Sequence, residues 1–179
     1  MNRSSWVNQC AVAAIGAMTI TACATLTVRS YSAPEFNFTE YQTYHWGPAD
    51  AAATGDPRLD NNPFFRERLH ADIERQLATR GLEKTVSGIP DLLIHHHESV
   101  EQRIAVPAVD REHGTCRDCA PTVYEAGTLT IDLVDTRTNR LVWRGWAEGA
   151  VDGVIDDQEW MEQKIDEAVI RILAKLPQR

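Results

Sequence analysis

Hydrophobic and polar residues repeat along the chain with two different periods, which separate predicted strands from predicted helices. Residues 36–46 (FNFTEYQTYHW) alternate and are rich in aromatic side chains, which predicts a strand. Its aromatic residues do not all share one face, so we expect a bend or a bulge in it. Residues 89–104 (IPDLLIHHHESVEQRI) also alternate and predict a second strand.

Residues 124–151 (YEAGTLTIDLVDTRTNRLVWRGWAEGAV) predict a β-hairpin. Apolar and polar side chains alternate before and after the segment DTRTN, whose Asp, Thr and Asn residues are typical of turns. Segments 47–63 and 105–122 are rich in Gly, Pro and polar residues, and we expect them to be long loops.

Two segments carry apolar residues at steps of three or four, which is the spacing of an amphipathic helix. The apolar stripe of residues 64–84 is Phe65, Leu69, Ile73 and Leu77. Pro63 suits the start of this helix and Gly81 suits its end. Residues 157–175 predict a last helix, which Pro177 terminates. Its stripe is Ile165, Val169, Ile172 or Leu173, and Leu176.

The predicted order of elements is strand, helix, strand, strand, strand, helix. This order fits a single α+β domain over residues 36–179. We expect an antiparallel four-stranded sheet with two helices packed on one face, as a two-layer sandwich. The second face of such a sheet is either wet or meets a partner.

The first 22 residues have the pattern of a secretory signal peptide. One charged residue, Arg3, precedes a short apolar run that Asn8, Gln9 and two threonines interrupt. A membrane-spanning helix needs about 20 mostly apolar residues, and this run is shorter and more polar. We therefore interpret residues 1–22 as a signal peptide that is removed.

The segment Ile20-Thr21-Ala22-Cys23 resembles the lipobox of bacterial lipoproteins. In such proteins the cysteine thiol is acylated and becomes the first residue, so Cys23 is the predicted lipidation site. Two or more acyl chains, such as palmitate, would give stable anchoring, whereas one chain binds only marginally. Residues 23–35 would then be the lipidated cysteine and a short tether. The alternative is an ordinary signal peptide that is cut elsewhere.

The residue after Cys23 and the net charge of the chain limit the predicted location and the predicted partners. Ala24 stands where inner-membrane lipoproteins typically carry Asp, so the resemblance favours the outer membrane, facing the periplasm. The formal net charge of −8 argues against nucleic acid as a partner. The predicted partners are the membrane, through the lipid, and an envelope protein.

Cys116 and Cys119 lie close together in the loop GTCRDCAP. An exported chain meets an oxidising compartment, so a disulfide between them is the default interpretation. Closing so small a loop restrains little of the unfolded chain, so the gain in stability would be small. A pair of metal ligands and a redox site are the alternatives, although a thioredoxin-like site normally opens a helix.

Three segments together resemble a family of bacterial lipoproteins known as domain of unknown function 4136. They are residues 55–84, 90–104 and 127–151, within a likeness that covers nearly all of 36–177. The most specific parts are Gly127-Thr128-Leu129 with Asp132, and Leu141-Val142-Trp143-Arg144-Gly145. The resemblance implies the lipid anchor and the α+β fold, but no activity, substrate or catalytic residue. The triple histidine and the cysteine pair are outside the family's pattern.

The triple histidine, residues 95–97, is the clearest candidate for metal chemistry. On a strand, His95 and His97 project to the same side and can present two imidazoles to one zinc ion. Zinc needs at least a third ligand. The candidates for it are Cys116, Cys119, His113 and His45. The alternative is that a half-exposed strand tolerates histidines and that His96 packs toward the helices. Zinc is the one cofactor that the sequence suggests.

Catalytic motifs are missing from the sequence. It contains neither a G-x-S-x-G nucleophile elbow nor a phosphate-binding glycine loop, so we expect no enzymatic activity. Trp143 and Trp146 fall on opposite faces of one strand, and Trp146 is a candidate for surface binding.

Two functions are therefore compatible with the sequence. The first is a lipid-anchored envelope lipoprotein with a non-enzymatic binding or structural role. The second is a metal-binding or metal-sensing lipoprotein that uses His95, His97, Cys116 and Cys119.

Overall fold

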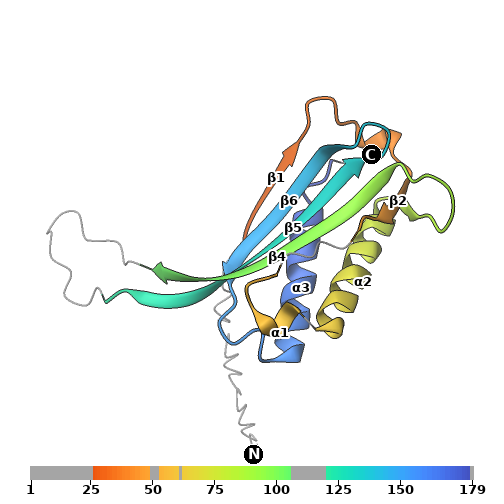
Figure 1. The fold of residues 1–179 in the computed structure, drawn as a ribbon. Helices are drawn as coiled ribbons and strands as arrows, with labels where there is room; N and C mark the ends of the chain where they lie inside the picture. The colour runs from red at the N-terminus through yellow and green to blue at the C-terminus, as the bar shows by residue number, and fades with distance from the viewer. Residues whose placement is uncertain (1–25, 49–52, 61, 106–119, 178–179) are drawn as a thin grey trace, which may run out of the picture.

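A six-stranded mixed β-sheet forms the centre of the structure (Figure 1), a computed structural model. It describes residues 26–48, 53–60, 62–105 and 120–177. The predicted signal peptide, Cys23, Cys116 and Cys119 lie outside the described residues. Predictions that depend on them therefore stay predictions.

Six strands run through the described chain in the order β1-β6-β5-β4-β2-β3. Antiparallel pairing joins β1 to β6, β6 to β5 and β5 to β4, whereas β2 runs parallel to both β4 and β3. The strands are β1 (Thr27–Ser32), β2 (Thr43–Trp46), β3 (Glu83–Lys84), β4 (Leu92–Ala105), β5 (Thr122–Asp135) and β6 (Arg140–Ala150).

The predicted four-stranded antiparallel sheet is therefore wrong. The sheet has six strands and is mixed, and three α-helices accompany it in the described chain. The additional strands are β1, within the segment expected to be a tether, and the short β3. The aromatic segment 36–46 forms a 3₁₀ turn (Phe38–Glu40) before β2, in place of one long strand.

Two long helices, α2 (Pro63–Thr79) and α3 (Gln158–Leu173), run side by side across one face of the sheet (Figure 1). The side chain of Asn62 caps the start of α2 by accepting a hydrogen bond from the Phe65 backbone N–H at 3.1 Å. Gly81 follows the end of α2 with a φ of 75°, a left-handed conformation that favours glycine. A third helix, α1 (Pro57–Asp60), is a single turn.

The core lies between the sheet and these helices. Ile94, Ile131 and Leu133 from the strands and Ile73 and Ile172 from the helices are almost completely buried. Trp143 of β6 is also fully buried, as expected for one of the two tryptophans on this strand. Trp146, on the opposite face, is only partly exposed.

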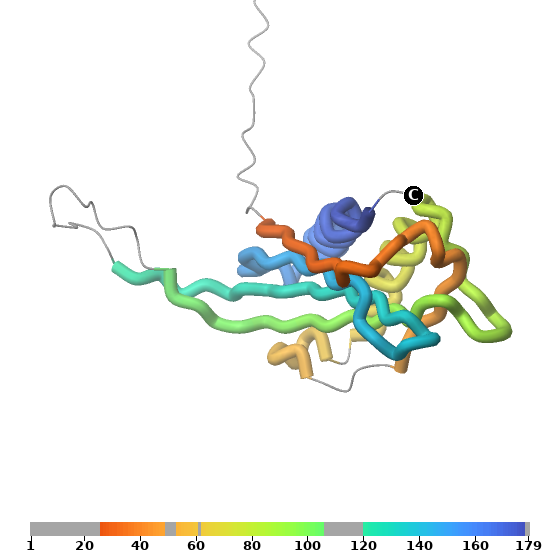
Figure 2. The backbone as a smooth tube through the Cα atoms, turned by 90° about the horizontal axis from the view of Figure 1, so that it is seen from above, coloured from red at the N-terminus to blue at the C-terminus, as the bar shows by residue number. Residues whose placement is uncertain are grey.

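The strands β4 and β5 extend beyond the rest of the sheet as a two-stranded arm (Figures 1 and 2). Pairing between β5 and β6 starts at Ala126, whereas pairing between β5 and β4 continues to Thr122, opposite Ala105. We define the arm as residues 103–105 and 122–124. None of the helices in the described part of the chain is both long and apolar enough to span a membrane.

Candidate functional site

A pocket of about 420 Å³ lies where β2 ends and β4 continues past it. Trp46 of β2, Phe65 and His70 of α2, and the three histidines 95–97 of β4 contribute to its wall. Such a concave site with a few convergent polar groups is the default location for ligand binding. We call it the histidine pocket.

Two histidines of this pocket contact each other through their ring nitrogens. His70 Nε2 lies 2.8 Å from His96 Nε2, and the two rings meet edge to face. His96 Nδ1 lies 2.5 Å from Glu98 Oε1 on the same face of β4. Because a carboxylate only accepts hydrogen bonds, His96 Nδ1 carries a proton and Glu98 orients the ring. The side chains therefore form a chain from Glu98 through His96 to His70.

Trp46 positions His70 from the other side. The two rings stack with their centroids 4.0 Å apart and an interplanar angle of 12°. Trp46 Nε1 donates a hydrogen bond to Glu74 Oε1 at 2.7 Å, and Lys84 Nζ donates to the same oxygen at 2.5 Å. Glu74 therefore orients the indole, and the indole stacks on the imidazole of His70.

Burial lowers the pKa of His70 to about 4, and the nearby His96 is the second cause of this shift. The pKa of Glu74 is lowered overall. Burial raises it, but hydrogen bonds from Lys84 and Trp46 outweigh this effect. At neutral pH the His70 ring is thus uncharged and its neighbour Glu74 is ionised.

The predicted metal ligands His95 and His97 lie on the opposite face of β4 from His96. The His95 ring lies against Gly47, where an added Cβ would fall 2.1 Å from the ring. His97 Nε2 lies 3.6 Å from Asp132 Oδ2, and Arg144 contacts the same carboxylate.

No group of three or more His, Cys, Asp or Glu side chains is placed to hold a metal ion in the described ranges. Cys116 and Cys119 lie outside them, so the four-residue site of His95, His97 and these cysteines is not tested.

Sequence reasoning missed His70. Its signal was present, because Arg66, His70 and Glu74 follow one another at four-residue steps beside the apolar stripe of the helix. A polar row at that position borders the buried face and can reach a neighbouring strand. The partner strand could not be named without the tertiary structure.

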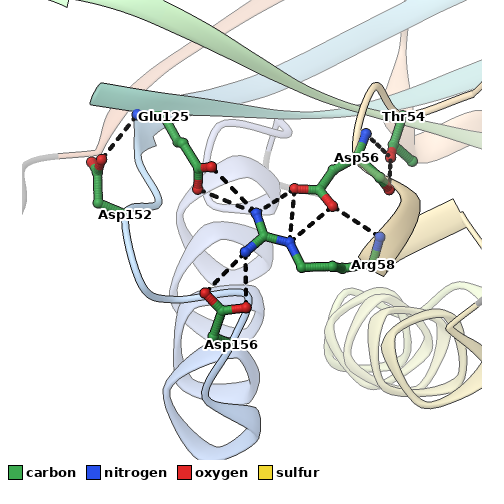
Figure 3. Close-up of polar contacts among 6 residues, drawn as sticks. All are labelled: Thr54, Asp56, Arg58, Glu125, Asp152 and Asp156. Carbon is green, nitrogen blue, oxygen red and sulfur yellow. Dashed lines mark hydrogen bonds and ion pairs between the residues drawn. The ribbon is translucent and has the colours of Figure 1, made fainter. Parts of the chain in front are cut away.

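Arg58 forms a second polar cluster, in which one guanidinium contacts three carboxylates (Figure 3). Its nitrogens lie 2.5 Å from Asp56, 3.3 Å from Glu125 of β5 and 2.8 Å from Asp156, which precedes α3. Hydrogen bonding to Arg58 lowers the pKa of Asp56. Asp152 accepts a hydrogen bond from the Glu125 backbone N–H at 3.0 Å. The cluster joins α1, β5 and the loop before α3, which is a structural role.

The fold of this chain is similar to several solved structures. A DUF4136 family protein from Bacteroides thetaiotaomicron matches with a TM-score of 0.54 and 11% identity, over 84% of this chain and 95% of that one. A PelC dodecamer from Paraburkholderia phytofirmans matches with a TM-score of 0.50 and 14% identity, over 87% and 99%.

A PDZ domain protein from Parabacteroides distasonis matches with a TM-score of 0.53 and 14% identity over 86% of this chain, which spans only 37% of that protein. No curated protein matches the sequence significantly. The sequence profile of DUF4136, a domain of unknown function, matches residues 28–178. The resemblance seen in the sequence is therefore confirmed, and the chain belongs to the DUF4136 family.

Proposed function

We propose that this chain is a lipid-anchored lipoprotein of the bacterial cell envelope that binds a protein partner and is not an enzyme. Its lipid would be attached at Cys23 and hold the domain at the outer membrane, facing the periplasm. The lipobox-like segment before Cys23 supports the anchor, and the β4–β5 arm supports the binding role.

The arm is the observation that carries the proposal. Ile104 of β4 and Val123 of β5 are direct partners across the arm, so their side chains lie on the same face. Ile104 is 65% exposed and Val123 is 60% exposed. Two neighbouring apolar side chains on a projecting ribbon gain free energy when a partner covers them. The arm is therefore suited to docking against another protein.

A second copy of the chain is the first partner to test. The similar PelC chain was solved as a dodecamer, so this fold is compatible with assembly in at least one protein. Other envelope proteins are the remaining candidates.

Crosslinking of the anchored protein in intact envelopes tests the binding role. We expect the native chain to give a specific crosslinked species, which the double variant Ile104→Lys, Val123→Lys loses. The matched control is Val86→Lys, Ile89→Lys, because these two residues are 95% and 89% exposed outside the arm. Crosslinks that survive in the arm variant, or that disappear equally in the control, would contradict the proposal.

Mass spectrometry of the purified native protein tests the anchor. We expect residues 1–22 to be absent and Cys23 to carry acyl chains, and we expect Cys23→Ser to release the protein from the membrane fraction. A native chain that retains residues 1–22 with an unmodified thiol would contradict the anchor, whatever the crosslinking shows.

A further inference from the structure

A second pocket, of about 100 Å³, lies between α3 and the strands β5 and β6, on the core side of the sheet. We call it the apolar pocket. We propose that it holds the end of one acyl chain of the lipid on Cys23, so that this chain folds back onto its own domain. The inference rests on the proposed lipid anchor, because it needs an acylated Cys23. It does not depend on the arm or on the histidine pocket.

Short side chains create the apolar pocket. The apolar stripe of α3 carries only a methyl group at Ala168, and the core face of β6 carries only a methyl group at Ala147. Larger apolar side chains surround this gap, namely Leu26, Leu69, Leu129, Val154, Met161 and Ile165. Walls of this kind give water few hydrogen-bond partners, so such cavities bind apolar molecules instead.

Two charged side chains of the described chain line the pocket, and both have partners. Glu98 contacts His96 Nδ1 at 2.5 Å, and Lys164 Nζ donates a hydrogen bond to Glu167 Oε2 at 3.0 Å. Neither charge needs a polar group from a ligand. The pocket is therefore suited to a hydrocarbon chain without a head group, which is the chemistry of the end of an acyl chain.

Leu26, the first residue that the structure describes, lies in the wall of this pocket. Its backbone carbonyl accepts a hydrogen bond from Arg171 Nη2 of α3 at 2.7 Å. Its side chain packs over Gly149 of β6, where an added Cβ would lie 2.9 Å from Leu26 Cδ2. Three residue steps separate Cys23 from Leu26, and they span at most about 11 Å. A lipid on Cys23 is therefore attached within reach of the pocket.

Covalent attachment makes this binding intramolecular. So short a linker gives an effective concentration in the millimolar range, so a weak affinity for the end of one chain is enough to fill the pocket. A triacylated cysteine keeps two chains in the bilayer when the third occupies the pocket, and two chains are enough for stable anchoring. The domain can therefore hold one chain without leaving the membrane.

Photo-methionine tests the proposal, because the sequence offers a natural single label. Its three methionines are Met1, Met18 and Met161. A chain that has lost residues 1–22 therefore contains Met161 alone, in the wall of the pocket. Irradiation releases dinitrogen from the diazirine of this label, and the resulting carbene inserts into a nearby C–H bond.

The measurement is mass spectrometry of tryptic peptides from irradiated envelopes that contain the full-length native chain. Trypsin cuts after Arg29, Arg144 and Lys164, so the label lies in peptide 145–164 and the lipid on peptide 23–29. We expect a cross-link that joins peptide 145–164 to an acyl chain on peptide 23–29.

Three variants provide the controls. Met161→Leu with Trp160→Met moves the label to a position that is 44% exposed, and we expect the cross-link to fall about ten-fold, because the label leaves the site where the acyl chain is concentrated. Ala168→Leu fills the pocket from α3 and should lower the yield about five-fold, because the added carbons exclude the chain. Its matched control, Ala78→Leu, makes the same change at an exposed position of α2 and should leave the yield unchanged. Circular dichroism checks that each variant folds.

The inference is overturned if peptide 145–164 carries no lipid, or only a phospholipid from the bilayer, while Cys23 is found acylated. That result leaves the proposed anchor intact. An equal yield in the native chain and in the variant with the label at position 160 also overturns the inference. If residues 1–22 remain attached and the Cys23 thiol is unmodified, the anchor fails, and the inference fails with it.

Discussion

Replacement of Asp135 by Asn removes a buried charge from the turn between β5 and β6 while keeping the shape of the side chain. Asp135 is 3% exposed. Its Oδ1 accepts hydrogen bonds from the backbone N–H groups of Arg137 and Thr138 at 2.8 and 2.9 Å. Its Oδ2 accepts from the Tyr41 hydroxyl at 2.9 Å and from the Arg137 guanidinium at 3.0 Å.

The size of the effect follows from the pKa of Asp135. Burial raises this pKa, but hydrogen bonds from Arg137, Thr138 and Tyr41 lower it further, to about 2 from an ordinary value of 3.8. A difference of this size corresponds to about 2 kcal/mol of folding free energy held by the ionised form. We expect Asp135→Asn to lower the free energy of unfolding by about this amount at pH 7.

The same contribution depends on pH in one direction. The pKa of Asp135 is lowered on folding, so the stabilisation is present above pH 4 and is lost as the pH falls toward 2. Urea unfolding followed by tryptophan fluorescence should therefore show a difference between native and Asp135→Asn proteins at pH 7 that closes at about pH 2. An equal difference at both pH values would refute the reasoning.

Arg137→Ala provides the comparison within the same turn. The Arg137 side chain is 68% exposed, so its ion pair with Asp135 is largely screened by solvent. We expect this variant to lower the free energy of unfolding by less than about 1 kcal/mol, because the backbone N–H groups still donate to Asp135. If it cost as much as Asp135→Asn, the ion pair and not the turn would be the source of the stability.

Four other substitutions test the packing and the start of α3 by urea unfolding. Ile73→Ala should lower the free energy of unfolding by about 2–5 kcal/mol, because this side chain is fully buried. Ile89→Ala, at an 89% exposed position, should change it by no more than about 0.5 kcal/mol. Equal losses in the two variants would contradict the assigned core. Asp157→Ala should cost about 1 kcal/mol, because its carboxylate accepts a hydrogen bond from the third residue of α3 at 2.8 Å, and an unchanged midpoint would show that water replaces this cap. Gly145→Ala should cost about 1–3 kcal/mol, since the added Cβ would lie 2.3 Å from the Trp143 ring; a neutral result would mean that the indole moves aside.

Local patterns in the sequence are sufficient to predict the two long helices of this fold and the turn between β5 and β6. The four-residue stripe from Phe65 to Leu77 and the stripe from Ile165 to Leu176 correspond to α2 and α3, and the DTRTN segment is the turn between β5 and β6. Each of these elements is stabilised by residues close to one another in the chain, so its pattern is visible without the tertiary structure.

The strands that the sequence analysis missed depend on distant partners. β1 has no alternation of apolar residues, and it forms because its backbone pairs with β6. The parallel pairing of β2 with β4 is secured by Asp91, whose carboxylate accepts the backbone N–H groups of Gln42 and Thr43 at 2.8 and 2.9 Å. No single segment encodes such pairings, which explains the wrong strand number and the wrong direction.

The candidate site was predictable only in part. The three histidines marked β4 as unusual, and the expectation that His96 faces the helices is correct, because its ring contacts His70 of α2. The sequence pointed to the partly buried pair His95 and His97. Alternation shows which residues share a strand face, but it does not show which helix covers the other face.

The position of β1 has a mechanical consequence for the lipoprotein that we propose. Only four residue steps separate Cys23 from Thr27, where β1 begins, and even fully extended they reach about 14 Å. If Cys23 carries the proposed lipid, the domain would lie close to the membrane surface and could not move far from it. A force applied to the lipid would therefore act almost directly on the backbone hydrogen bonds between β1 and β6.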